Sequence, residues 1–284
     1  MSGDELQSAG ISSHFSGSLT EHPEQRRLFR LSLPTNFPLD QEEQVEPPES
    51  CLPFFGIMPQ VVNLIETISA WNKQGVFMSM DGNFQGSMHA FTQALVSLKS
   101  LFRNTRTVNI SSFSRSWCLE AIQVIAPEAP TTFDGNWTLA NNFFIITPIS
   151  ASLASTMTES ELDALTAVLM YNFGLAMQLS CLVDSQGRSK KFIKIRQLYK
   201  FAAAFAHELG SAEGELVVFW LSVSNNLAAL ALDVFDYDTF EASREWMGIL
   251  LVTAITCIPS YNPDPIARNL ATTRSVRDMP APTA

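Results

Sequence analysis

The sequence predicts an all-α protein made of consecutive pairs of helices. From about residue 59 onward, apolar residues recur at the three- and four-residue spacing of amphipathic helices, with short polar turns between them. The composition is 46% hydrophobic and includes 20 Phe, which is ample for a thick core. We therefore expect one helical domain with a long, partly ordered insertion and disordered ends.

The N-terminal region differs from the rest of the chain in composition. Residues 1–52 are rich in Ser, Glu, Pro and Gln, which bury too little apolar surface to support a packed core. More than half of the net charge of −10 lies in this acidic region. We predict a disordered acidic tail over 1–52, a helical domain over 53–258 and a flexible C-terminal tail over 259–284.

The first helix pair is expected on either side of a turn at Asp81-Gly82-Asn83. Its first helix should begin at Pro59, because proline suits the first turn of a helix, and should end at Met80. Its second helix is expected from Phe84 to about Phe102.

Residues 103–157 form the predicted insertion, in which Ser, Thr, Asn and Pro are interspersed with aromatic residues. The stretch "NNFFIITPI" has the β-branched and aromatic content of a strand, and "SWCLEAIQVI" is interpreted as a short helix. Because a structureless loop of this length would be unusual, we expect the insertion to pack against the helices.

Helical patterns return after the insertion and form two further pairs. A capping box from Thr158 to Glu161 is expected to open the first of these helices, and "VDSQGRSKK" to end it. Asp238 is expected to open the last helix, which Pro259 terminates. The four expected helices cover residues 158–182, 192–209, 215–234 and 238–258.

The first pair carries a specific pattern of large and small residues, formed by Trp71, Gly75, Gly82, Phe84, Phe91 and Ala94. This pattern resembles the tetratricopeptide (TPR) repeat. Gly174 and Ala228 take the position of Gly75 in the later pairs, which match less well and at irregular spacing. The resemblance implies an irregular, TPR-like α-solenoid of about three helix pairs that acts as a non-catalytic scaffold for protein binding.

The small residues have a physical explanation. A mid-helix glycine costs about 1 kcal/mol relative to alanine, whereas burying one aromatic ring contributes about 1.5–3 kcal/mol. We therefore predict that each small residue lets the helices of a pair approach and bury a large ring of the second helix. The predicted combinations are Gly75 with Phe91, Gly174 with Tyr199, and Ala228 with Trp246.

Polar pairs recur just before these small residues, on the helices that line the concave groove in a TPR-like stack. These are Asn72-Lys73, Tyr171-Asn172 and Asn225-Asn226. Side-chain amides carry both donors and acceptors, so they suit the backbone of an extended peptide. We therefore predict a groove that binds a segment of a protein partner; the alternative is that these residues face water or the chain's own insertion.

A second candidate surface is basic and contains no acidic residue among its members. It consists of Arg188, Lys190, Lys191, Lys194, Arg196 and Lys200. Such a patch concentrates positive potential and could bind an acidic partner segment or the chain's own acidic stretch "DQEEQVEPPE". The alternative is an ordinary solvated helix face.

Composition and motifs argue against several other functions. The net charge of −10 disfavours nucleic acid as a partner, because phosphate binding draws on Lys and Arg. The sequence contains no dinucleotide-binding, phosphate-binding, nucleophile-elbow or HExxH motif, and its four cysteines form no CxxC pair. We expect no catalytic residues, metal or cofactor.

Two alternatives of a different class are carried forward. The charge-free stretches 164–183 and 216–232 could indicate a membrane-associated helical protein, although their polar residues favour buried helices without stable membrane insertion. An enzyme using the 103–157 insertion is the less favoured alternative.

The N-terminus lacks a secretory signal, so we expect a cytoplasmic or nuclear protein. The apolar stretch "WMGILLVTAITCI" suggests self-association through one end of the stack.

Overall fold

The computed structural model describes residues 61–104, 117–123, 139–148, 159–183, 188–206, 215–258 and 261–272. Six helices form three pairs: α2 (Val61–Met80) with α3 (Phe84–Asn104), α4 (Glu159–Val183) with α5 (Arg188–Ala206), and α6 (Glu215–Asp233) with α7 (Tyr237–Cys257). Two strands, β1 (Trp117–Gln123) and β2 (Asn142–Pro148), lie between the first two pairs in sequence, and α8 (Asp264–Thr272) follows the third. The expected fold class is confirmed at this level: the described chain is mainly helical, with paired helices and a small two-stranded sheet.

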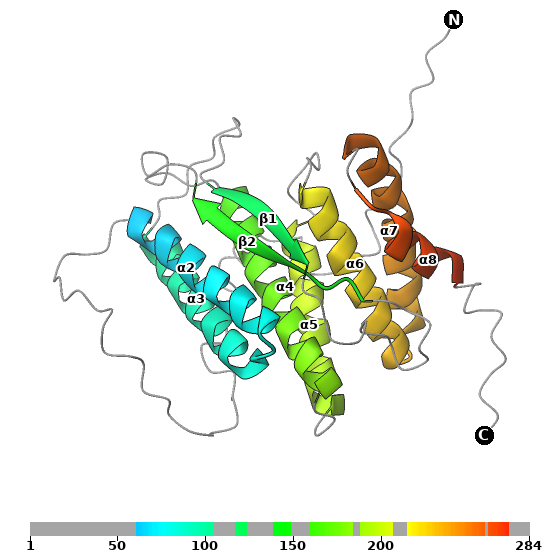
Figure 1. Ribbon diagram of the computed structural model, residues 1–284, viewed down its shortest axis with the longest axis horizontal. Coiled ribbons are helices and arrows are strands. Elements are labelled where there is room, and N and C mark those ends of the chain that lie inside the picture. Colours follow the sequence, from blue (N-terminus) through cyan, green and yellow to red (C-terminus); the bar gives the residue numbers. More distant parts are fainter. Residues whose placement is uncertain are drawn as a thin grey trace, which may run out of the picture.

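The three pairs stand side by side in sequence order, and the strands lie across one face of the row (Figure 1). Neighbouring pairs contact each other through α3 and α4 and then through α5 and α6. The central helix α4 is buried at every residue from Glu161 to Leu179, so the lack of charged residues after Asp163 follows from its place in the core. The window 161–182 is long and apolar enough to cross a membrane, but 89% of it is buried inside the protein.

Close packing at the small residues is confirmed for two of the three predicted combinations. A Cβ atom built on Gly75 would lie 2.7 Å from Cε1 of Phe91, and one on Gly174 would lie 2.9 Å from Cε1 of Tyr199. Neither distance is sterically acceptable, so both rings occupy space that only glycine leaves free. In the third pair Ala228 is fully buried, and the Trp246 ring packs against the core.

The turns between paired helices have defined local causes. Gly82 has φ of 75°, a left-handed conformation that glycine adopts at little cost, and it lies between α2 and α3. The Asn83 side chain then accepts a hydrogen bond from the backbone N–H of Gly86, which satisfies one free donor in the first turn of α3. The turn predicted at Asp81-Gly82-Asn83 therefore separates α2 from α3, and the two helices pack against each other.

The two strands are antiparallel, with Trp117 opposite Pro148 and Gln123 opposite Asn142. The predicted strand in "NNFFIITPI" is confirmed as β2. The predicted short helix in "SWCLEAIQVI" is wrong, because this stretch forms β1. Its buried Leu119 lies between the exposed Cys118 and Glu120, an alternation that fits a strand paired along the buried β2.

The starts of two helices also differ from the prediction, and one helix was missed. Helix α5 begins at Arg188 rather than at 192, so part of the supposed turn "VDSQGRSKK" is helical. Helix α7 is capped by Asp236, whose side chain accepts from the Thr239 N–H, and Asp238 lies inside its first turn. Helix α8 was missed inside the predicted C-terminal tail. The predicted N-terminal tail and the capping residue Thr158 lie outside the described residues.

Candidate functional site

The face of the row that carries the strands is formed by the first helix of each pair, α2, α4 and α6. One asparagine from each of these helices points at the insertion: Asn72, Asn172 and Asn226. All three side chains are fully buried. They lie two or three residues before Gly75, Gly174 and Ala228, so the pattern that sets helix packing also sets the register of these amides.

Two of the asparagines bind the backbone of the insertion with both amide atoms. Asn172 Oδ1 accepts from the Phe144 N–H at 3.1 Å, and Asn172 Nδ2 donates to the Phe144 carbonyl at 2.8 Å. Asn226 binds Ala140 in the same way, with both distances 2.8 Å. Each side chain thus does what a neighbouring β-strand would do for one residue.

The third asparagine makes only one of these two bonds. Asn72 Oδ1 accepts from the Ile146 N–H at 2.9 Å, but the Ile146 carbonyl accepts instead from Ser69 Oγ at 2.5 Å. Asn72 Nδ2 is buried and has no hydrogen-bond partner within the part of the chain that the structure describes. The first helix therefore holds the segment with two side chains, but it leaves one buried donor unpaired.

The three bound residues alternate along an extended segment. Ala140, Phe144 and Ile146 are separated by even numbers of residues, so their backbone groups emerge on the same edge of the chain. The intervening residues of β2 face the opposite edge, where β1 lies. Strand β2 is therefore hydrogen-bonded along both edges, by β1 on one side and by helix side chains on the other.

A group of buried aromatic rings, called the seat below, packs against residues 143 and 144 of β2. The Phe143 ring stacks on Phe91, with ring centroids 6.1 Å apart. Phe144 packs edge-on against Tyr171 at 5.6 Å and against Phe219 at 5.1 Å. Because Phe91 is the ring that Gly75 admits, close packing within the first pair also positions the seat for β2.

Two buried tyrosines complete the seat. Tyr171 OH lies 3.4 Å from the Ala140 carbonyl, to which it donates, and the Tyr171 ring lies 5.6 Å from that of Tyr199. Tyr199 OH donates to Gln178 Oε1 at 2.6 Å. Burial raises the pKa of both hydroxyls well above the ordinary tyrosine value, so both stay neutral. They serve here as hydrogen-bonding core residues.

The third pair is covered on the same face by a second segment of the chain. Asn269 in α8 donates from Nδ2 to Asn225 Oδ1 at 2.7 Å, and Asn225 Nδ2 donates to Asn226 Oδ1 at 3.2 Å. Asn225 therefore couples α8 to Asn226.

The predicted groove residues divide into two groups. Asn72, Tyr171, Asn172, Asn225 and Asn226 are brought together and buried under the chain's own segments. The alternative that they face the insertion therefore holds for Asn72, Tyr171, Asn172 and Asn226. Lys73 does not join them, because it is exposed and its Nζ lies 5.7 Å from the centroid of the Phe77 ring.

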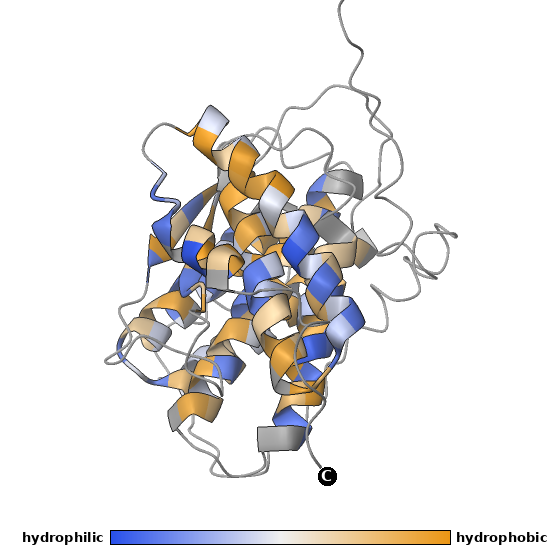
Figure 2. Ribbon diagram, turned by 90° about the vertical axis from the view of Figure 1, so that its right-hand side faces the viewer, coloured by the Kyte–Doolittle hydropathy of each residue, from blue (hydrophilic) through white to orange (hydrophobic). Residues whose placement is uncertain are grey.

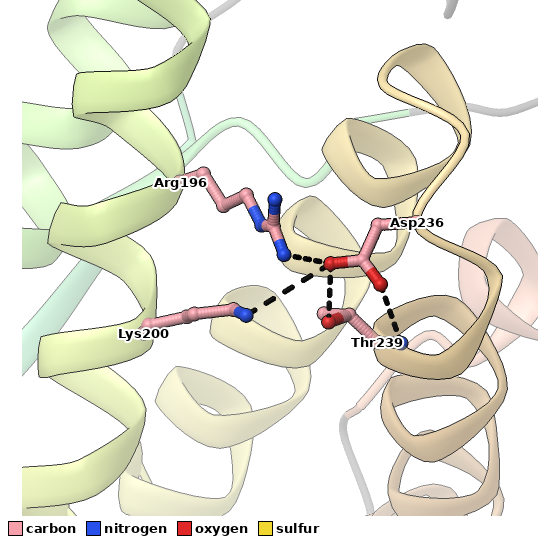
Figure 3. A network of polar contacts seen from close by, with 4 residues as sticks. All are labelled: Arg196, Lys200, Asp236 and Thr239. Carbon is pink, nitrogen blue, oxygen red and sulfur yellow. Dashed lines mark hydrogen bonds and ion pairs between the residues drawn. The ribbon is translucent and has the colours of Figure 1, made fainter.

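The predicted basic patch is split by an acidic residue that sequence reasoning did not connect with it. Arg196 forms an ion pair with Asp236, the capping residue of α7, and Lys200 lies 3.9 Å from the same carboxylate oxygen (Figure 3). Thr239 Oγ1 also donates to this oxygen at 2.7 Å. Burial, followed by the neighbouring Arg196 charge, lowers the pKa of Lys200.

The remaining members of the patch lie nearer the start of α5. Lys190 is exposed, Lys191 and Lys194 are partly buried, and the side chain of Arg188 lies outside the described residues. Arg196 and Lys200 thus link the second and third pairs through Asp236.

Comparison of the chain with models of known protein families, with curated proteins and with solved structures finds no match. The structure shows paired helices without assigning them to a family. Within the described ranges, no group of three or more His, Cys, Asp or Glu residues is placed to hold a metal ion.

The amides were predicted from the sequence, but the insertion was named only as the alternative to a partner, and the residues that they bind were not predicted. Ser69, Asn269 and the receiving residues Ala140, Phe144 and Ile146 were not predicted as part of the site. The predicted strand at "NNFFIITPI" was the available signal: apolar residues on both faces indicate a buried strand, and the backbone groups of a buried strand need hydrogen-bond partners on each edge.

Proposed function

We propose that the protein is a non-catalytic interaction scaffold of the TPR-like kind, and that it binds an extended segment of a protein partner along the outer edge of β1. The observation that supports this proposal is the double anchoring of β2. Helix amides bind one edge of β2 and β1 pairs with the other, so β1 is the outer strand of the two-stranded sheet among the described residues.

The buried segment itself is a poor candidate for exchange with a partner. Phe143, Phe144, Ile145 and Ile146 are all at most 5% exposed. Burying each such side chain contributes about 1.5–3 kcal/mol, so a partner that displaced β2 would have to replace most of that stabilisation. The proposed partner site therefore moves from the floor of the groove to the strand held above it.

The outer edge of β1 has the required backbone groups. Leu119 lies opposite Ile146 and Ala121 opposite Phe144, and the backbone groups of Ile146 and Phe144 turn toward the helices. In an antiparallel pair, facing residues direct their N–H and C=O groups either both inward or both outward. The N–H and C=O of Leu119 and Ala121 therefore point away from β2, and those of the exposed Ala121 can pair with an added strand.

The accessible part of this edge lies at Ala121. Cys118, Glu120, Ala121 and Gln123 are exposed, while Leu119 is buried and anchors the strand. An added strand would gain main-chain hydrogen bonds without displacing any described segment. Such binding tolerates many partner sequences, with selectivity from side chains on alternate positions.

The test removes the outward-pointing backbone N–H of β1 at Ala121 and leaves the hydrogen bonds between β1 and β2 in place. In Ala121→Pro the outward N–H is lost, whereas proline is tolerated on an edge strand where that N–H faces solvent. We expect wild type and Ala121→Ser to retain a shared set of crosslinked protein partners in cell extract, and Ala121→Pro to lose that set. Thermal unfolding of all three variants checks that the domain stays folded.

The proposal fails if a folded Ala121→Pro variant recovers the same partners as Ala121→Ser. It also fails if the partners are lost only in a variant that disrupts the basic residues, such as Lys190→Glu/Lys194→Glu.

A further inference from the structure

We propose that the outward face of α7 is an interface for a second copy of this chain, in which two α7 helices pack antiparallel around a twofold axis at the level of Leu250. This interface is separate from the edge of β1 and does not depend on the proposed function.

The position of α7 in the row is the first reason. Helices α3 and α5 each contact the first helix of the following pair. Helix α7 belongs to the last pair, and Ile249, Val252 and Ile255 on it are 39%, 66% and 52% exposed. Figure 2 views the molecule from the end where α7 and α8 lie in Figure 1, and the helices there contain many hydrophobic residues.

Gly248 is the second reason, and it is independent of exposure. A Cβ atom at Gly75 or Gly174 would collide with an aromatic ring of the paired helix, which explains both glycines. A Cβ atom at Gly248 would meet nothing within 4 Å. A mid-helix glycine destabilises a helix relative to alanine, and nothing in the described chain compensates for it at this position.

The spacing of Gly248 and Val252 makes this face complementary to itself. The two residues are four apart, so they lie one above the other on the same side of α7. When two such helices are related by a twofold axis midway between these positions, Val252 of each copy lies over Gly248 of the other. The Val252 side chain of each copy then packs where Gly248 of the other copy has no side chain. The same contact occurs twice, as an isologous interface requires.

Charge does not oppose this arrangement even though the chain carries a net charge of −10. Residues 248–257 contain no charged side chain, and the nearest charged residues on α7 are Arg244 and Glu245. Glu245 of one copy lies across from Ile255 of the other, because both are five residues from the axis. The two Glu245 carboxylates are then about 15 Å apart along the helices, beyond the Debye length at physiological salt.

The test is the oligomeric state of the full chain across a range of concentrations, measured by sedimentation. One helix per copy gives a small interface, so we expect a reversible dimer with a dissociation constant on the order of micromolar. Val252→Glu should weaken the dimer tenfold or more. Ile193→Glu is the matched control, because Ile193 is 60% exposed on α5 and should leave dimerisation unchanged.

Gly248→Ala separates the interface from folding. The added methyl group meets no atom of its own chain, so the melting temperature of the monomer should rise, while contact with the partner's Val252 should weaken the dimer at least several-fold. A chain that stays monomeric at all concentrations would overturn the proposal, as would a dimer insensitive to both Val252→Glu and Gly248→Ala. Protection of Val252 by residues 1–60 of the same chain would show as a monomer and would also overturn it.

Discussion

At the scale of single residues, the two glycines inside helices α2 and α4 have one role in packing and a second in the seat of the insertion. Gly75 admits the Phe91 ring, which in turn stacks on Phe143 of β2. Gly174 admits Tyr199, which packs on Tyr171 beneath the same segment. A methyl group at either position would push a ring toward β2.

We expect Gly75→Ala and Gly174→Ala to destabilise the fold, although alanine is the better helix former. The gain in helix propensity is about 1 kcal/mol, whereas forcing an extra methyl group into a packed core costs about 1–3 kcal/mol. The net loss should be larger at Gly75, where the contact is shorter and the Phe91 ring is held from both sides. Urea unfolding measures it.

Gly248→Ala is the control for this pair, because it adds the same methyl group to a helix where nothing lies within 4 Å. At concentrations that keep the chain monomeric it should stabilise. A loss of stability at all three glycines would mean that the methyl group disturbs the helices themselves, and the explanation by ring packing would be wrong.

At the scale of elements, the asparagines replace a third strand along β2. Asn172 uses both amide atoms on Phe144, whereas Asn72 uses one on Ile146 and buries the other unpaired. The two positions look alike in sequence, but their energetic contributions should differ. An unpaired buried donor or acceptor costs about 1–3 kcal/mol.

Asn172→Ala should therefore lower the free energy of unfolding more than Asn72→Ala. The first change leaves both the N–H and the carbonyl of Phe144 without a hydrogen-bond partner, which should lower the free energy of unfolding by about 2–4 kcal/mol. The second change leaves the Ile146 N–H without a partner but also removes the unpaired Nδ2 of Asn72. The loss should therefore be about half as large or less. Equal losses in urea unfolding would show that the difference in hydrogen bonding has no energetic weight.

The sequence was informative about helices and much less so about strands and contacts. Helix pairs were predictable because periodicity and turn residues such as Gly82 are local signals. Strand β1 was misread because "SWCLEAIQVI" fits a short helix as well as a strand, and pairing with β2 decided between them. Helix α8 was missed because Pro263 and Pro265 suggested a chain end, whereas they lie at its start.

The candidate site shows the same limit. Asn172 and Asn226 were identified from their register before a small residue, but Ala140 and Ile146 could not be assigned to them. Their contacts span 86 residues for Asn226 and 74 for Asn72, and no local pattern specifies such pairings. The Arg196–Asp236 ion pair was hidden for the same reason, because a cap on one pair meets a helix of another.

At the scale of the whole molecule, one aromatic cluster joins the second pair, the third pair and the insertion. Tyr171 contacts Phe144, Tyr199 and Phe219, which belong to β2, α5 and α6. Unfolding should therefore be cooperative across the helix pairs, and the ionisation of this cluster should be coupled to the global fold.

Alkaline conditions should expose this coupling. Burial raises the pKa of Tyr171 and Tyr199 in the folded state above the ordinary value of 10.0. The unfolded chain releases these protons first, so their contribution to stability is complete below about pH 10 and is lost as the pH rises further. Melting temperatures between pH 8 and 11.5 should fall steeply above pH 10.

Tyr171→Phe removes one of these groups and should flatten the fall, at the expense of the hydrogen bond to Ala140. Tyr237→Phe, at an exposed position, is the control and should leave the profile unchanged. An identical slope in wild type and Tyr171→Phe would contradict the coupling.

The segment from Ala140 to Ile146 is hydrogen-bonded to α6, α4 and α2 in turn, so its length must match the distance across the three pairs. Six residues of extended chain measure about 20 Å, roughly two spacings between packed helices. An open array can gain or lose a unit and keep its neighbouring contacts. An additional pair inserted between α2 and α6 would leave one end of this segment short of its asparagine, so the length of the segment sets how far apart the three pairs lie.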